Sequence, residues 1–340
     1  MSLQRLRDLL SDAPPIAPAP NRDHESLIAD AIAYLGSEEA AQSLQANAYW
    51  PKWNSPWWQM ALLYEMGAAD IIPKTAVAGM TKAIQAQLAP FFFSEDAPSG
   101  LDPALNLPCH CQLGNIYQIL AACGVDMDQA LPWARPWFLR YQMPDGGLNC
   151  DESAYRSSPP ASSIVGTIAP LEAVLYFARR PLTAEEEQFL DRGAHCLLAR
   201  QLRHGCSVEH NAEERLDEEK WLKPCFPRFY LYDVLRGLRF VLRWSEALKR
   251  PLPADAIVEV VAHLCKVSSD GTVRIGRLSY EGVGTRERNP SGEWVRAERA
   301  SRFPLLDEVS SIGQVSPYLT VECGESLSLL RRVLRDGLVR

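Results

Sequence analysis

The chain has 340 residues, of which 47% are hydrophobic and 23% charged, and its formal net charge is −7. This negative charge argues against a nucleic-acid partner, because phosphate binding needs a positive surface. No run reaches the roughly 18 to 20 apolar residues that span a bilayer, and the N-terminal stretch lacks the apolar segment of a signal peptide. Nine scattered cysteines are typical of reduced thiols packed in a core. We therefore expect a cytoplasmic protein without a transmembrane segment.

The chain begins with a helical stretch and then a segment rich in Pro and Ala. Residues 12–22 contain Pro14-Pro15 and Pro20, which a continuous helix does not accommodate. We therefore expect an N-terminal arm over residues 1–22 and a single domain over residues 23–340.

Two kinds of helix are expected to alternate along this domain. Helices with charge on one face are predicted at residues 24–36, 75–90, 129–142, 185–203 and 253–267. More apolar helices, several starting just after Pro or Ser, are predicted at residues 56–67, 112–124, 162–178, 229–245 and 317–335. The apolar set should lie inside and the charged set outside, which predicts an all-α fold of about five to six helical hairpins.

The region from about 268 to 315 departs from this alternation. Residues 269–276 favour a turn with short extended segments, and residues 282–302 are polar. We expect an irregular insertion here, which is either a lid-like loop or a solvated connection without function.

A short pattern recurs where helices end. Phe138–Gln142 is followed by Met143-Pro144-Asp145-Gly146-Gly147, and Leu197–Gln201 is followed by a second turn that ends at Gly205. Repetition on this scale is typical of an array of supersecondary units, each of which needs its neighbours to bury its apolar face.

Gln142 with the following Asp145-Gly146-Gly147, and with Phe138 four residues before it, resembles the repeat of squalene/hopene-type triterpene cyclases and protein prenyltransferase β-subunits. The segment 226–236 is similar to a stretch of bacterial prenyltransferase-like proteins of that superfamily. The resemblance implies an α/α toroid, in which inner helices line a central cavity for an isoprenoid or other hydrophobic molecule.

The chain also departs from the cyclase pattern. Leu148 stands where the cyclase repeat has Trp, and no Asp-x-Asp-Asp acid motif is present. Protonation of an alkene needs a very strong acid held by its neighbours. These departures argue against triterpene cyclase activity.

Two short segments could supply metal ligands. Cys109-His110-Cys111 is predicted at the start of one inner helix, and Cys150-Asp151 leads toward the next. Zinc takes Cys, His and carboxylate ligands. The resemblance to prenyltransferases and to lanthionine-synthetase-like toroids implies a possible zinc site here. Adjacent residues of a helix cannot all face one ion, so at most two of the first three are expected to bind it; buried thiols and a capping His are the alternative.

Charged residues at the fourth inner helix form a second candidate site. Asp233 and Glu172 are the candidate catalytic carboxylates, because Glu172 is the lone carboxylate of an apolar helix and desolvation would raise its pKa. Arg228 and Arg236 could hold an anion. The remaining candidate ligand-binding residues are aromatic: Tyr230, Tyr232, Trp57 and Trp58.

A salt-bridged face is the alternative for these charges. Arg236, Arg239 and Arg243 share one helix face, and Asp233 would then pair with Arg236 one turn on.

The repeat and the resemblance together favour a toroid whose pocket takes a hydrophobic or isoprenoid-like molecule. A non-catalytic binding or scaffold toroid, and a carbohydrate-active (α/α)-barrel enzyme with Glu172 and Asp233 as paired carboxylates, are the alternatives. The sequence leaves open whether the protein is an enzyme.

Overall fold

The structure is a computed structural model that describes residues 2–13, 24–206, 214–280 and 284–340. Within these ranges it is predominantly helical, so the all-α prediction is confirmed. The Pro/Ala segment predicted for residues 12–22 lies outside the described residues from residue 14 onward.

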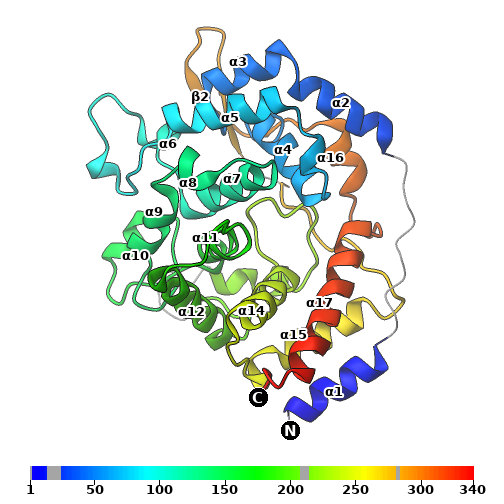
Figure 1. Ribbon diagram of the computed structural model, residues 1–340. Coiled ribbons are helices and arrows are strands. Elements are labelled where there is room, and N and C mark those ends of the chain that lie inside the picture. Colours follow the sequence, from blue (N-terminus) through cyan, green and yellow to red (C-terminus); the bar gives the residue numbers. More distant parts are fainter. Residues whose placement is uncertain (1, 14–23, 207–213, 281–283) are drawn as a thin grey trace.

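Five mostly apolar helices pack one after another around the middle of the molecule (Figure 1). We call them the inner helices: α4 (Pro56–Glu65), α7 (His110–Ala122), α11 (Ile164–Tyr176), α14 (Val234–Leu248) and α17 (Pro317–Arg335). Consecutive members contact each other, α4 with α7, α7 with α11, α11 with α14 and α14 with α17. Their bounds match the predicted apolar helices closely, except that α14 begins later than predicted.

A second set of helices covers the outside of the inner ones (Figure 1). Each packs against one or more inner helices: α3 (Glu38–Ala46), α5 (Lys74–Gln87), α9 (Ala134–Arg140), α12 (Ala184–Ala199) and α15 (Ala254–Val267). Further out, α1 (Ser2–Asp12) lies on α15, and α2 (Glu25–Leu35) contacts α3, α4 and α16 (Pro304–Val309). Helix α3 was not among the predicted helices.

Short elements connect these helices. They comprise η1 (Ala69–Ile71), η2 (Ser94–Asp96), α6 (Pro103–Asn106), α8 (Met127–Ala130), α10 (Glu152–Arg156) and α13 (Glu218–Trp221). The region predicted to be irregular contains α16 and a hairpin of β1 (Thr285–Arg288) and β2 (Trp294–Ala297), which pair antiparallel with Thr285 opposite Ala297. The Thr285 hydroxyl accepts a hydrogen bond of 2.7 Å from the Lys52 backbone amide, so the hairpin is anchored next to the segment that precedes α4.

Candidate functional site

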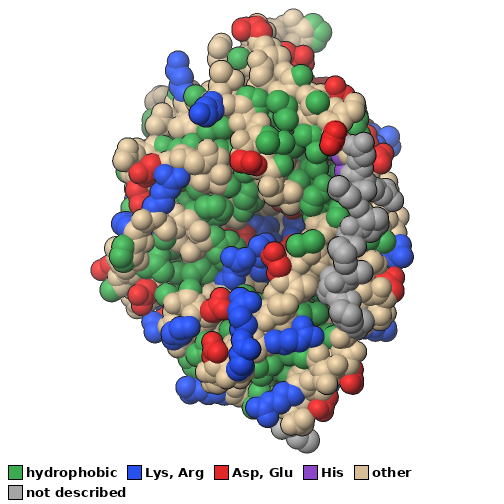
Figure 2. All heavy atoms as spheres, turned by 45° about the vertical axis from the view of Figure 1, so that its right-hand side comes forward, with side chains coloured by type: hydrophobic (Ala, Val, Ile, Leu, Met, Phe, Trp, Pro, Cys, Tyr) green, Lys and Arg blue, Asp and Glu red, His purple; other side chains and the backbone are tan. Residues whose placement is uncertain are grey.

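A pocket of about 640 Å³ lies between the inner helices, and all five of them contribute to its wall. Charged side chains from α4, α11, α14, α17 and the loop before α14 line it: Glu65, Glu172, Arg228, Arg236, Arg239, Arg243, Glu322 and Glu325. Figure 2 shows a hollow in this region, where basic and acidic side chains lie among hydrophobic ones. A second pocket of about 500 Å³, lined mainly by α3 and α5, has no comparable convergence of charge, so we take the central pocket as the candidate ligand site.

Asp233 determines how the loop before α14 joins the helix. It is the N-cap of α14, and its carboxylate accepts hydrogen bonds from the Arg236 amide (2.9 Å), the Cys225 amide (3.0 Å) and Arg228 Nε (2.8 Å). Burial acts to raise the pKa of Asp233, but Arg228 and the two amides hold it below its usual value. Asp233 is not among the residues that line the pocket. Its ion pair is with Arg228, and Arg236 contributes only its backbone amide.

Glu172 and Arg236 form a buried ion pair in the pocket wall. Arg236 Nη2 lies 2.5 Å from Glu172 Oε2, and Arg236 Nε lies 3.0 Å from the same oxygen. Gln118 Nε2 donates to this carboxylate as well, at 3.2 Å. The fold therefore brings together two candidate residues from different inner helices, Glu172 of α11 and Arg236 of α14. Each of the predicted carboxylates, Glu172 and Asp233, is neutralised by a different arginine.

Several donor groups in the pocket have no hydrogen-bond partner among the described residues. They are Arg228 Nη2, Arg239 Nε and Tyr176 Oη. Arg228 is only 6% exposed and also pairs with Glu322 at 2.7 Å. The closest approaches of Arg239 to carboxylates are long, 3.6 Å to Glu322 and 3.8 Å to Glu325. Because an unsatisfied buried donor is costly, this arrangement is suited to a ligand that supplies acceptors.

Glu65 is a pocket residue that the sequence analysis did not select. Its two carboxylate oxygens accept the backbone amides of Arg228 (2.7 Å) and Phe229 (2.5 Å), so it holds the loop before α14 against the end of α4. Burial raises the pKa of Glu65 to about 7. The sequence could have indicated Glu65, because it is the one acidic residue of α4. The same argument selected Glu172.

The four aromatic candidates lie outside the pocket lining. Tyr232 is fully buried and donates to the Leu202 carbonyl at 2.6 Å, and Tyr230 accepts a hydrogen bond from Lys52 Nζ at 2.8 Å. The indole N–H groups of Trp57 and Trp58 donate to Asn115 Oδ1 (2.9 Å) and to the Tyr49 carbonyl (3.1 Å). Phe229, rather than Tyr230, faces the pocket.

A cluster of three thiols lies where α7 begins. Cys109 Sγ is 3.2 Å from Cys111 Sγ, which is 3.3 Å from Cys150 Sγ, and all three sulfur atoms lie within 4.8 Å of one another. Cys109 is the N-cap of α7, and Cys150 comes from the loop before α10. This thiol cluster could hold a metal ion.

The other two candidate ligands, His110 and Asp151, are not part of the thiol cluster. The His110 ring packs on Trp137, with centroids 4.3 Å apart, and on Phe92 at 4.5 Å, and burial lowers the pKa of His110 to about 3. Asp151 is the N-cap of α10 and accepts the Ser153 amide at 2.9 Å. The set of side chains close enough together to share one ion is therefore narrower than the five residues named from the sequence, and it consists of sulfur ligands alone.

Lys52 lies near the thiol cluster, and aromatic rings surround its ammonium group. It is 8% exposed, and its ammonium lies 5.0–5.8 Å from the ring centroids of Tyr49, Trp50, Trp53, Trp58 and Tyr230. Burial lowers the pKa of Lys52, whereas negative charge on Cys111 and Cys109 acts to raise it. Among the described residues no carboxylate forms an ion pair with Lys52, and the partners of its ammonium group are the Tyr230 hydroxyl and the five aromatic rings.

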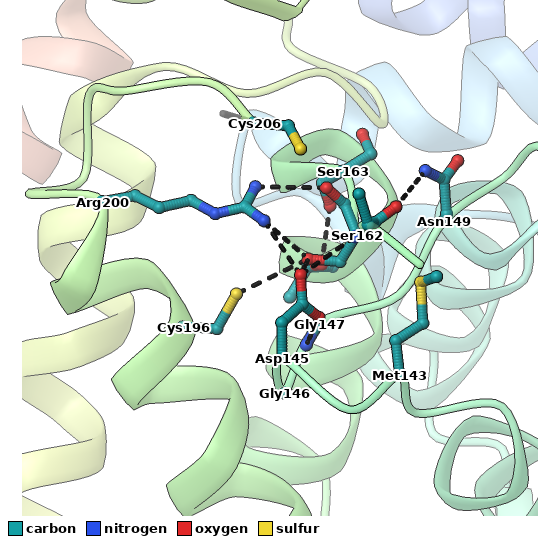
Figure 3. Close-up of polar contacts among 12 residues, drawn as sticks. Met143, Asp145, Gly146, Gly147, Asn149, Ser162, Ser163, Cys196, Arg200 and Cys206 are labelled. Atoms are coloured by element: carbon teal, nitrogen blue, oxygen red, sulfur yellow. Dashed lines mark hydrogen bonds and ion pairs between the residues drawn. The ribbon is translucent and has the colours of Figure 1, made fainter. Parts of the chain in front are cut away.

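The Asp-Gly-Gly turn has a structural role (Figure 3). Asp145 accepts the Gly147 amide (3.2 Å), the Ser162 amide (3.0 Å) and the Ser162 hydroxyl (2.8 Å), and pairs with Arg200 at 3.1 Å. Gln142 Nε2 donates to the carbonyls of Gly146 and Phe189, both at 2.8 Å. The motif therefore joins the end of α9 to α12 and to the start of α11, away from the pocket lining.

No protein family, curated protein or solved structure matches this chain. None of the helices in the described ranges is both long and apolar enough to cross a membrane.

Proposed function

We propose that the protein is an α/α toroid whose central pocket binds a small molecule with an anionic group on a hydrophobic or isoprenoid-like body. The order of helix contacts supports this architecture, since α4, α7, α11, α14 and α17 follow one another and α5, α9, α12 and α15 pack outside them. A pocket with walls from all five inner helices is what such a ring would enclose.

The observation that carries the proposal is the set of unpartnered donors. Arg228 Nη2, Arg239 Nε and Tyr176 Oη are buried donors without partners among the described residues, and all three belong to side chains that line the same pocket. Guanidinium donors are suited to carboxylate and phosphate oxygens. A ligand with an anionic group would therefore satisfy donors that the protein itself leaves without partners.

Aromatic side chains provide the apolar part of the site. They line the pocket from the inner helices and the loop before α14: Tyr64, Tyr176, Phe177, Phe226, Phe229 and Tyr318. Pockets for small molecules typically combine such apolar walls with a few polar groups that fix orientation. Eight charged residues make this pocket poorly suited to a ligand that is hydrocarbon alone.

The proposal is one of binding and includes no catalytic step. A carbohydrate-active enzyme with Glu172 and Asp233 as its acid–base pair is less well supported, because Asp233 does not line the pocket and its oxygens are occupied. A negative binding test would favour the remaining alternative, a scaffold toroid that has lost its ligand.

Farnesyl diphosphate is expected to raise the melting temperature of the protein more than farnesol or inorganic pyrophosphate does. Only the first probe supplies both the anionic group and the apolar body, and ligand at 100 times its Kd stabilises a native state by about 2.7 kcal/mol. Arg239→Gln should weaken binding about tenfold, because it removes a charged donor from the pocket. Thermal shift and calorimetry measure both effects.

Arg250→Gln is the matched control for that variant. Arg250 is 38% exposed and pairs with Glu187 and Asp191, much as Arg239 is 33% exposed and lies near Glu322 and Glu325, but it does not line the pocket. If no probe shifts the melting temperature, the scaffold alternative replaces the proposal. Equal shifts of the melting temperature with farnesol and farnesyl diphosphate would show that the ligand needs no anionic group, and that part of the proposal would be wrong.

The thiol cluster supports a second proposal, that Cys109, Cys111 and Cys150 hold a zinc ion. Three thiolates at these separations suit a tetrahedral ion with one further position. Three thiolates around Zn²⁺ leave negative charge in excess, which the buried Lys52 ammonium would offset.

Purified protein is then expected to hold about one zinc ion per chain by elemental analysis. Cys111→Ser should lose this zinc, because Cys111 lies between the other two sulfur atoms. Cys123→Ser, at the opposite end of α7, should retain it. Protein without zinc both before and after zinc loading would contradict the proposal.

A further inference from the structure

Opposite charges lack close partners at the two ends of the central pocket. At the mouth, Arg243 is exposed and stacks on Tyr176 with its guanidinium 5.3 Å from the ring, and no ion pair of the described residues includes it. At the inner end, Glu65 accepts only the backbone amides of Arg228 and Phe229, and it too is in no ion pair of the described residues. Both residues line the pocket.

The inner end has more carboxylates than guanidinium groups. Arg228 and Arg236 face or lie next to four acidic residues, which are Glu65, Glu172, Asp233 and Glu322. Each of these arginines forms its ion pairs with other carboxylates, and both side chains act on Glu65 only through their charge, which acts to lower the pKa of Glu65 without an ion pair to it. A positively charged or donor-rich ligand group would be favoured here.

At the mouth, Arg243 is the guanidinium group without an ion pair among the described residues. Arg239 and Arg243 lie there with Glu325, which is 58% exposed and 3.8 Å from Arg239, and Arg239 also lies 3.6 Å from Glu322. Arg239 Nε and Tyr176 Oη are without partners among the described residues. Three donors therefore converge where an anionic group would sit.

The separation of the two ends follows from helix geometry. Arg236, whose Nη1 donates to the Phe229 carbonyl at 3.4 Å, is at the level of Glu65, which accepts the Phe229 amide. Arg243 is seven residues further along α14, which is a rise of about 10 Å. The backbone positions of Arg243 and of Arg236, which is level with Glu65, are therefore on the order of 10 Å apart along α14.

We infer that the ligand of the central pocket is a zwitterion, with its anionic group at Arg239 and Arg243 and an amine about 10 Å away at Glu65. The inference rests on the proposed binding function and narrows its ligand class.

Three probes with the same eight-carbon chain test this inference: octanoate, octylamine and 8-aminooctanoate. Calorimetry at pH 8, where Glu65 is largely ionised, is expected to show that 8-aminooctanoate binds about tenfold more tightly than octanoate. Octylamine lacks the anionic group and should bind more weakly than 8-aminooctanoate.

Two pocket variants and one control complete the experiment. Glu65→Gln should bring the affinities of 8-aminooctanoate and octanoate to within about twofold, while its octanoate affinity shows that the pocket is intact. Arg243→Gln should weaken both ligands. Glu214→Gln is the control, because Glu214 also accepts two backbone amides, from Ile164 and Cys206, but lies outside the pocket lining.

The outcomes separate the two claims. Equal affinities of octanoate and 8-aminooctanoate, or a tenfold difference that persists in Glu65→Gln, would overturn the zwitterion while the anion-binding function stands. If neither carboxylate binds and farnesyl diphosphate also fails to bind, the proposed function fails and the zwitterion with it.

Discussion

Replacement of Arg236 by methionine is expected to lower the free energy of unfolding by about 3–5 kcal/mol, since it leaves the buried Glu172 carboxylate without its cation. Both side chains are nearly inaccessible, at 7% and 5% exposed. The guanidinium also donates to the carbonyls of Phe229 (3.4 Å) and Leu231 (2.6 Å), which methionine cannot do. Urea denaturation followed by circular dichroism measures the loss.

Arg332→Met provides the exposed counterpart. Arg332 pairs with Glu246 at 3.1 Å, but the two side chains are 48% and 36% exposed, so we expect a change within about 1 kcal/mol. The double variant Arg236→Met with Glu172→Met should recover part of the loss, because it removes the unpaired charge as well. A cost below about 1 kcal/mol for Arg236→Met would mean that water solvates Glu172 through the pocket, and the pair would then not be a structural part of the wall.

Helices could be predicted because their ends are encoded locally. Pro56 and Pro317 occupy the first turns of α4 and α17, and Gly67 and Gly124, which follow α4 and α7, adopt positive φ values of 76° and 93°. These residues need no knowledge of tertiary contacts. The predicted and observed starts of α4 and α17 consequently agree to the residue.

The start of α14 shows where local reasoning failed. Residues 229–233 are apolar enough to extend the helical pattern, but Phe229 has a positive φ of 55° and Asp233 caps the helix, so α14 begins at Val234. The backbone of this loop is held by Glu65 from α4, a residue far away in the sequence. No periodicity within the segment could reveal that contact.

The charged residues of the pocket could be selected individually but not paired. Glu172 stood out as the lone carboxylate of an apolar helix, and Arg228 and Arg236 as possible anion holders at the head of an inner helix. The partner of each, however, depends on which inner helices are neighbours. Asp233 pairs with Arg228 across a loop and Glu172 with Arg236 across two helices. The thiol cluster likewise joins residues 39 positions apart. Only the three-dimensional arrangement shows that Cys111 belongs to this cluster and that His110 does not.

Gly114→Ala is expected to destabilise the protein by about 3 kcal/mol and to weaken ligand binding, because α7 and α11 touch at this glycine. A Cβ atom there would lie 2.5 Å from the Ala169 carbonyl carbon and 2.6 Å from Pro170 N. Both are backbone atoms of α11, so neither can move aside without moving the helix. One turn further along α7, Gln118 Nε2 donates to the Ala169 carbonyl (3.0 Å) and to Glu172 (3.2 Å), and these bonds would lengthen as the helices separate.

Gly36→Ala is the matched control for this substitution. Gly36 follows α2 with ordinary helical dihedrals, and its added Cβ would meet the Ile32 carbonyl at 3.5 Å, an ordinary contact. Its unfolding free energy should stay the same or rise slightly, as for a glycine replaced at a compatible position. Urea denaturation and calorimetry with octanoate give both readouts. If Gly114→Ala lowers the free energy of unfolding no more than Gly36→Ala does, then Gly114 is not what allows α7 to approach α11 closely.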